Sequence, residues 1–218
     1  MKRLLLLLAV AGAVTALAIP TASAAVHVLP LSAHPNGWTY HQWHAIWNIR
    51  SFERDFRSNH SLYPGRNGQC GQKVGQAKAW LLPYQAGFQD QLSALCRIKP
   101  GTRLVLDAAG AIGLYAGPER VKAQLEAAWS DIKAVSATLD GRTLRLHVIR
   151  SPFLHFKLPY YNARELDLPA TTVSFMARDY FAILSPIPRG LHTLRTSATY
   201  DFGSGPETYS MTLWLNVR

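Results

Sequence analysis

Histidines and tryptophans are concentrated near the start of the chain, in "HPNGWTYHQWHAIWNIR" (residues 34–50). His41 and His44 are three residues apart, a spacing at which two imidazoles on a helix can bind a metal ion if a third ligand, such as Asp55 or His60, folds back. The chain contains no H-E-x-x-H motif and no adjacent acidic partner. This pattern favours histidines that lie at the surface or support other groups, and we predict no metal ligands here.

The tryptophans of this segment permit two interpretations. Trp38, Trp43 and Trp47 could form an aromatic platform for sugars. The four-residue spacing of Trp43 and Trp47, with Tyr40 three positions earlier, is more typical of rings that a helix buries against a sheet. We expect the stripe of Tyr40, Trp43 and Trp47 to be buried, with the two histidines toward its edge. The candidate ligand-binding residues are Trp38, His41, His44 and Arg50.

No constellation for nucleophilic catalysis is present. The chain lacks a G-x-S-x-G elbow, and its glycine-rich "GQCGQKVGQ" does not match a phosphate-binding loop. His192, in "GLHTL", is expected to make a structural hydrogen bond to a nearby carbonyl, and Asp140-Gly141 to form a turn. The carboxylates have no spacing that would select a pair for glycoside hydrolysis. We therefore predict no catalytic residues and no cofactor.

The first residues have the features of a bacterial Sec signal peptide. Lys2 and Arg3 precede the apolar run 4–18, and Ala22-Ser23-Ala24 matches the A-x-A cleavage site. The alternative, a transmembrane anchor, is disfavoured because the apolar run is short and Pro20 follows it. We expect a signal peptide over residues 1–24 and a single secreted or periplasmic domain over residues 25–218.

Charge and cysteine content agree with export. The formal charge of +10 becomes +8 when Lys2 and Arg3 are removed, and the remaining basic residues are scattered rather than clustered. A basic exported protein is attracted to an anionic envelope polymer or glycan, whereas no nucleic-acid motif is present. Cys70 and Cys96 are the only cysteines. In an oxidising compartment they are expected to form a disulfide.

Two helices are predicted. The first covers residues 38–57, with Thr39 as a plausible N-cap after the Asn36-Gly37 turn. The second covers residues 118–135, with Pro118 in its first turn and an apolar stripe behind it.

The rest of the chain favours β-structure. "AKAWLLPY" and "CRIKPGTRLVLDAA" predict strands, and everything after Gly141 is expected to be sheet. In "RTLRLHVIR" the residues Leu144, Leu146 and Val148 should share one face. In the last strand alternate residues from Tyr209 to Val217 should point inward, while Ser210, Thr212, Trp214 and Asn216 point outward. We predict a mainly β fold, an antiparallel β-sandwich of immunoglobulin-like or jelly-roll-like type, decorated by the two helices.

Several motifs occur in a fixed order along the mature chain. They are "TYHQWHAIW", "CGQKVGQAKAWLL", "CRIKPGTRLVL", "TLDGRTL", "SPFLHFKLP", "LSPIPRGLHTLR" and "TYSMTLWLNV". In this order the sequence resembles a family of secreted bacterial proteins of unknown function, with a Tyr/Trp-rich N-terminal helix, two cysteines and a C-terminal PxGxHTL hairpin. It departs from that pattern at Gln42, where an acidic residue is usual, and at Arg178-Asp179-Tyr180. The resemblance implies location and fold, and no reaction.

Three functions remain open. The preferred hypothesis is an exported, non-enzymatic binding or envelope-associated domain, because the sequence combines export, sandwich-like strands and a basic surface with no catalytic signature. The alternatives are a secreted hydrolase of an envelope or environmental polymer, and a metal-binding exported protein. An exposed, flat aromatic patch would favour binding, and a deep site with convergent carboxylates or histidines would favour the hydrolase.

Overall fold

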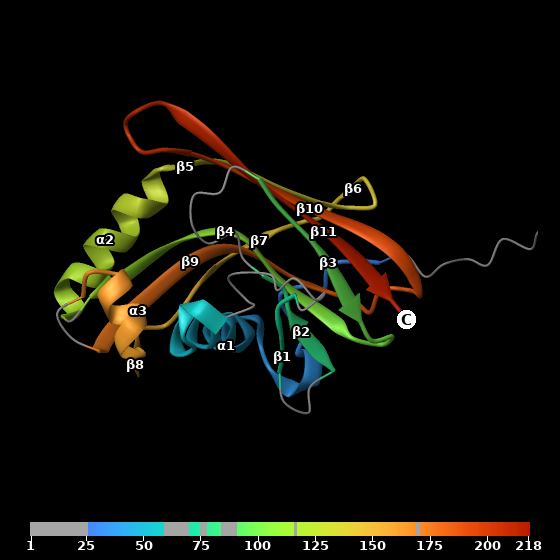
Figure 1. Cartoon of the computed structure of the whole chain (residues 1–218), viewed down its shortest axis with the longest axis horizontal. Helices are drawn as coiled ribbons and strands as arrows, with labels where there is room; N and C mark the ends of the chain where they lie inside the picture. Colours follow the sequence, from blue (N-terminus) through green and yellow to red (C-terminus); the bar gives the residue numbers. More distant parts are fainter. Residues whose placement is uncertain (1–25, 59–69, 75–77, 84–90, 116, 169–170) are drawn as a thin grey trace, which may run out of the picture.

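The computed structural model describes residues 26–58, 70–74, 78–83, 91–115, 117–168 and 171–218. The expected signal peptide at 1–24 and most of the glycine-rich connection before Ala77 lie outside the described residues. The protein is a sandwich of two β-sheets with helices packed around it (Figure 1).

The first sheet, sheet A, has the strand order β1-β2-β4-β9-β7, and β8 pairs with another part of β9. Its strands are β1 (Gln72–Lys73), β2 (Ala79–Leu81), β4 (Arg103–Tyr115), β7 (His147–Arg150), β8 (Leu154–Lys157) and β9 (Thr172–Leu184). The second sheet, sheet B, has the order β3-β11-β10-β5-β6. Its strands are β3 (Gln91–Ile98), β5 (Ile132–Leu139), β6 (Arg142–Thr143), β10 (Gly190–Asp201) and β11 (Pro206–Val217).

The predicted β-sandwich is therefore confirmed, but the pairing is not purely antiparallel. β3 runs parallel to β11, and β2 runs parallel to β4. In both pairs the partners are distant in sequence, so no hairpin turn forces them to be antiparallel.

The helices are α1 (Tyr40–Glu53), α2 (Pro118–Ser130) and α3 (Tyr160–Glu165), with short 3-10 turns at η1 (Pro35–Gly37) and η2 (Phe56–Ser58). Thr39 caps α1 as predicted. Its hydroxyl accepts from the Gln42 backbone N–H, and the Gln42 side chain accepts from the Thr39 N–H, which completes a capping box. α3 corrects the expectation that the whole region after Gly141 is sheet.

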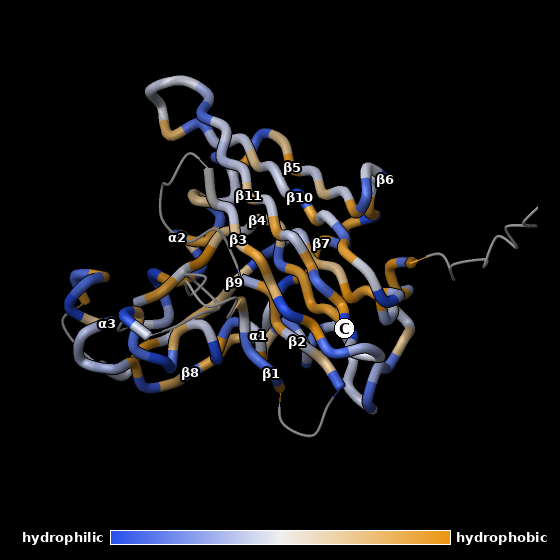
Figure 2. Tube along the Cα trace, turned by 45° about the vertical axis from the view of Figure 1, so that its right-hand side comes forward, coloured by the Kyte–Doolittle hydropathy of each residue, from blue (hydrophilic) through white to orange (hydrophobic). Residues whose placement is uncertain are grey.

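Sheet A lies between two hydrophobic layers. On one side Leu106 of β4 and Ala182 of β9 pack against sheet B. On the other side Phe181 and Ile183 of β9 pack against α1, which covers this face. Successive residues of a strand point to opposite faces, and both faces of β9 are covered. Side chains on both faces are therefore buried, and the strand is apolar along most of its length (Figure 2).

Sheet B has only one buried face. In β11 the residues Tyr209, Met211, Leu213, Leu215 and Val217 are all buried, as the alternation predicts. The prediction for "RTLRLHVIR" is wrong, because the segment divides between β6 of sheet B and β7 of sheet A. As the chain crosses between sheets the alternation is interrupted, and Val148 is exposed instead of sharing a buried face with Leu144.

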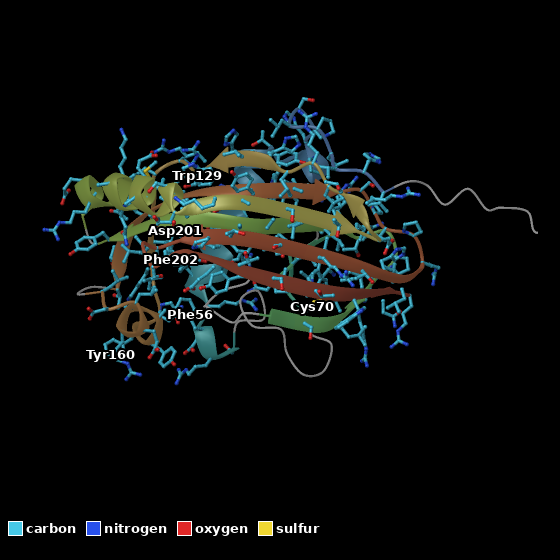
Figure 3. The ribbon with its side chains drawn as sticks, turned by 90° about the horizontal axis from the view of Figure 1, so that it is seen from above. Phe56, Cys70, Trp129, Tyr160, Asp201 and Phe202 are labelled. Carbon is cyan, nitrogen blue, oxygen red and sulfur yellow. A yellow bond between two sulfur atoms is a disulfide. The ribbon has the colours of Figure 1, made fainter. Side chains whose placement is uncertain are left out.

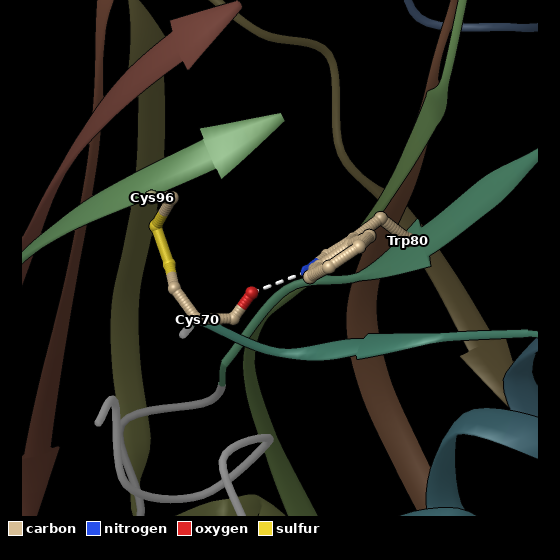
Figure 4. Close-up of a disulfide and its surroundings, with 3 residues drawn as sticks. All are labelled: Cys70, Trp80 and Cys96. Carbon is tan, nitrogen blue, oxygen red and sulfur yellow. Dashed lines mark hydrogen bonds between the residues drawn. A yellow bond between two sulfur atoms is a disulfide. The ribbon is translucent and has the colours of Figure 1, made fainter. Parts of the chain in front are cut away.

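The disulfide between Cys70 and Cys96 is present, and its Cα atoms are 5.1 Å apart (Figure 4). It joins the segment before β1 to β3, and so connects the sheet A side to the sheet B side. The indole N–H of Trp80 donates to the Cys70 carbonyl. Gly71 has φ of +80°, and a Cβ there would lie 1.8 Å from the Leu81 carbonyl oxygen. The half-cystine therefore sits in a turn that requires glycine.

Candidate functional site

The aromatic stripe of α1 is a packing surface. Tyr40, Trp43 and Trp47 are each at most 2% exposed. The Trp43 indole donates to the Pro35 carbonyl at 3.0 Å, and the Trp47 indole donates to the Leu82 carbonyl at 3.3 Å. The Tyr40 hydroxyl donates to the Leu29 carbonyl at 2.5 Å. Burial raises the pKa of Tyr40 to about 12 despite the hydrogen bond from the Ile183 backbone. The expectation that this stripe docks the helix onto the domain is confirmed.

The four candidate ligand-binding residues do not form one surface. Trp38 is partly buried and packs against Trp43 with ring centroids 4.8 Å apart. His41 is exposed, with its Nδ1 3.2 Å from the Arg150 carbonyl oxygen, and Arg50 is also exposed. His44 is fully buried. The expectation that His44 lies at the edge of the stripe is corrected, because its side chain points directly at sheet A.

His44 belongs to a buried polar cluster between α1 and sheet A. Its Nε2 is hydrogen-bonded to Oδ2 of Asp179 on β9. Asn48, one turn later on α1, donates to the same Asp179 oxygen at 3.2 Å and to the His44 carbonyl at 3.1 Å. Asp107 on β4 completes the group. We call His44, Asn48, Asp107 and Asp179 the buried cluster; none of the four is more than 2% exposed.

A glycine of β4 leaves space for the Asp179 side chain. The pairing of β4 with β9 shifts register between Asp107 and Ala109, and Gly110 then lies opposite Asp179. A Cβ at Gly110 would be 1.6 Å from Oδ1 of Asp179. Because any larger residue would clash with this carboxylate, glycine is required at position 110 if Asp179 is to point toward α1.

The buried cluster contains two carboxyl groups, those of Asp107 and Asp179, that interact with each other. Burial and the nearby Asp179 carboxylate raise the pKa of Asp107 well above its ordinary value, although the Ala109 backbone N–H opposes this by donating to it. Within the described part of the chain, Asp107 Oδ1 and His44 Nδ1 have no hydrogen-bond partner. A buried carboxyl near a second carboxylate is most stable when protonated.

The buried cluster contains the residue types of an acid–base site, but solvent does not reach it. A substrate would have to displace α1 to contact any of the four side chains. Among the described residues no group of three or more His, Cys, Asp or Glu has a metal-binding arrangement. In this structure the cluster therefore joins α1 to sheet A rather than facing a ligand.

His192 has the structural role expected for it. Its Nε2 lies 3.0 Å from the Pro188 carbonyl, and its Nδ1 lies 2.7 Å from Oδ2 of Asp140. Asp140 and Gly141 both have positive φ and form the predicted turn between β5 and β6. Oδ1 of Asp140 also accepts from the Thr193 N–H. This network connects the β5–β6 turn to β10.

One side of sheet B faces solvent, and no described helix covers it when the molecule is seen from above (Figure 3). We call it the outer face. Its residues alternate with the buried ones along each strand. They are Ser93, Leu95 and Arg97 of β3; Pro206, Thr208, Ser210, Thr212, Trp214 and Asn216 of β11; Leu191, Thr193, Arg195, Ser197, Thr199 and Asp201 of β10; Ala134, Ser136 and Thr138 of β5; and Thr143 of β6.

Trp214 lies on β11, three residues before the end of that strand at Val217, and is 40% exposed. Its cross-strand neighbours are Thr193 of β10 and Leu95 of β3, and Leu95 is 45% exposed. Most other positions carry serine or threonine, and the hydroxyls of Thr199 and Thr208 lie 2.8 Å apart. The outer face thus offers an apolar ring within a flat array of hydroxyl groups.

Sequence analysis assigned Trp214 to the solvent side but did not select it as a site residue. The signal was available, because a tryptophan in the outward register of an otherwise Ser/Thr-rich strand is unusual for a solvated position. Among the described residues no helix is long and apolar enough to cross a membrane. Comparison with family models, with curated proteins and with solved structures finds no match for this chain.

Proposed function

We propose that the protein is an exported, non-enzymatic binding domain that binds a glycan polymer of the bacterial envelope on the outer face of sheet B. The observation that carries this proposal is Trp214, a large aromatic side chain exposed within a flat, hydroxyl-rich sheet face. Aromatic rings provide apolar area with little loss of conformational entropy, and the apolar faces of sugar rings can stack on them.

The surrounding residues suit such a ligand. Serine and threonine hydroxyls both donate and accept hydrogen bonds, as sugar hydroxyls do. The strands hold these groups in rows, with neighbouring strands about 4.8 Å apart, so the binding face is rigid before the ligand arrives. The signal peptide pattern and the disulfide support an extracytoplasmic location, where envelope glycans are found.

The competing hydrolase hypothesis has less support. Its acid–base residues would have to be His44, Asp107 and Asp179, which converge but are buried beneath α1. Among its described residues the outer face carries a single carboxylate, Asp201 at the end of β10, whereas glycoside hydrolysis needs two carboxyl groups beside the scissile bond. Binding without hydrolysis is therefore the preferred function.

The test is binding of the mature protein to insoluble cell-envelope polysaccharide, measured by depletion of the protein from the supernatant. Trp214→Ala should weaken binding at least tenfold, since removal of an aromatic residue from the centre of a binding face commonly has effects of about 2 kcal/mol or more. Its melting temperature should change little because the ring is partly exposed.

Tyr160→Ala is the matched control, because Tyr160 is 76% exposed but lies on α3, away from sheet B. It should bind as the unmodified protein does. Equal binding by all three proteins would show that the outer face is not the binding site. Release of soluble sugar during the assay would instead favour the hydrolase.

A further inference from the structure

The charge of the outer face identifies a narrower class of ligand; this inference rests on the proposed function. Arg195 of β10 lies opposite Thr212, and Arg97 of β3 lies opposite Asn216. Each is therefore a diagonal neighbour of Trp214, with backbones about 7–8 Å away, and the two lie on opposite sides of it. Counting strands and residues, the two arginines are separated by roughly 16 Å.

Neither arginine is neutralised within the described structure. Arg57, Arg150, Arg164 and Arg178 form ion pairs with carboxylates, whereas Arg97 and Arg195 have none among the described residues. Asp201, the last residue of β10, is the one described carboxylate with the outward register; it lies six residues from Arg195 and accepts from the Gly203 and Gly205 N–H groups. The two guanidinium groups therefore leave a net positive charge of two beside the exposed tryptophan.

A structural role could account for only one of these residues. Charged residues on edge strands prevent sheets from pairing edge to edge, and β3 is an edge strand of sheet B. Arg195 lies on β10, which has paired strands on both sides, so protection of an edge does not explain it. On a solvated inner strand an unpaired arginine is available for a ligand.

We propose that the ligand is an acidic polysaccharide whose sugar rings carry carboxylates, that is, a polyuronate. The planar guanidinium fork matches a carboxylate in a two-bond arrangement. Because a uronate carries its acid on the sugar ring, a ring stacked on Trp214 keeps its carboxylate within reach of Arg97 or Arg195. The polymer then crosses β3, β11 and β10 along the diagonal that joins the two arginines.

The experiment compares binding of the mature protein to polygalacturonate, to the same polymer with its carboxylates methyl-esterified, and to inorganic polyphosphate, by isothermal titration calorimetry. Polygalacturonate should bind most tightly, and its affinity should fall as salt is raised. The double variant Arg97→Gln/Arg195→Gln should lose at least tenfold in affinity for polygalacturonate and should not discriminate it from the esterified polymer. The control Lys122→Gln/Lys157→Gln removes the same charge from exposed residues of α2 and β8 and should retain the affinity.

Each other result overturns a specific step. Equal affinity for the esterified polymer, with Trp214→Ala still defective, would overturn the polyuronate but leave glycan binding on the outer face intact. Tighter binding of polyphosphate would overturn the choice of carboxylate. An equal loss in the Lys122/Lys157 variant would show that net charge, rather than this face, attracts the polymer. Binding unaffected by Trp214→Ala would overturn the proposed function itself.

Discussion

His44→Ala should be one of the most destabilising substitutions in α1. The imidazole is fully buried and forms the side-chain contact between the helix and Asp179, which is 2% exposed. Without it, Asn48 is the one residue in the described part of the chain whose side chain donates to the Asp179 carboxylate, at 3.2 Å. Removal of one partner of a buried, hydrogen-bonded pair usually costs about 3–5 kcal/mol.

This magnitude translates into a large thermal shift. For a domain of this size each kcal/mol lowers the melting temperature by roughly 2–4 °C, so His44→Ala should melt about 6–20 °C below the unmodified protein. His41→Ala is the matched control, because it removes the same side chain from the same helix at an exposed position. The assay is differential scanning calorimetry of the purified mature protein at pH 7, and His41→Ala should melt within about 2 °C of the unmodified protein because surface changes have small effects.

A double-mutant cycle separates the contribution of the His44–Asp179 hydrogen bond from the cost of the cavity that removal of the imidazole leaves. If the pair matters, His44→Ala and Asp179→Asn together should destabilise less than the two single effects added, because the double variant leaves no unpaired buried carboxylate. The reasoning is refuted if His44→Ala and His41→Ala melt at the same temperature. Additive single effects would show that only lost packing, and not the hydrogen-bonded pair, holds α1 to sheet A.

Three further predictions concern other parts of the interior. Asp107→Asn should raise stability at neutral pH. Because the pKa of Asp107 is raised in the folded protein, the stability that this residue contributes is present below about pH 4 and is lost as pH rises. Between pH 4 and 8 the melting temperature should therefore depend less on pH in the variant than in the unmodified protein, and parallel pH profiles would contradict this. Trp47→Ala should cost about 3–5 kcal/mol as a core truncation; an unchanged denaturant midpoint would show that the ring is not needed for docking. Reduction of Cys70–Cys96 should remove about 3–4 kcal/mol, given its 26-residue separation, and two free thiols in non-reduced mature protein would refute the bond in solution.

The local sequence pattern correctly predicted those elements that depend only on neighbouring residues. The alternation in β11 specified which residues are buried, because a shift of one residue would expose all five inward side chains. Thr39, predicted as the N-cap, does cap the first helix, but that helix is Tyr40–Glu53 and is shorter than the predicted 38–57. The segment 144–150 was mispredicted because its alternation continues across a change of sheet, which depends on tertiary structure rather than on local sequence.

The buried cluster was missed for a different reason. His44 and Asn48 are one turn apart and lie on the same side of α1 as the aromatic stripe, but the sequence analysis placed His44 toward the edge of the stripe and assigned no role to Asn48. Their partner Asp179 is 135 residues away from His44, so no local spacing connects them. A signal did exist, because Asp107 and Asp179 interrupt otherwise apolar strand sequences, "RLVLDAAG" and "ARDYFAIL". Acids within such strands indicate a buried polar contact, since charged residues are rarely fully buried without partners.

The two sheets differ in how many of their faces are exposed to solvent. β4 and β9 of sheet A are apolar on both faces, because sheet B covers one face and α1 covers much of the other. β10 and β11 of sheet B alternate strictly, which is the pattern of a sheet with one solvated face. Trp214 occupies an outward position of this pattern, opposite Leu95 of β3. The proposed binding face rests on this exposed tryptophan and on its two diagonal neighbours, Arg97 and Arg195, which have no ion pair among the described residues.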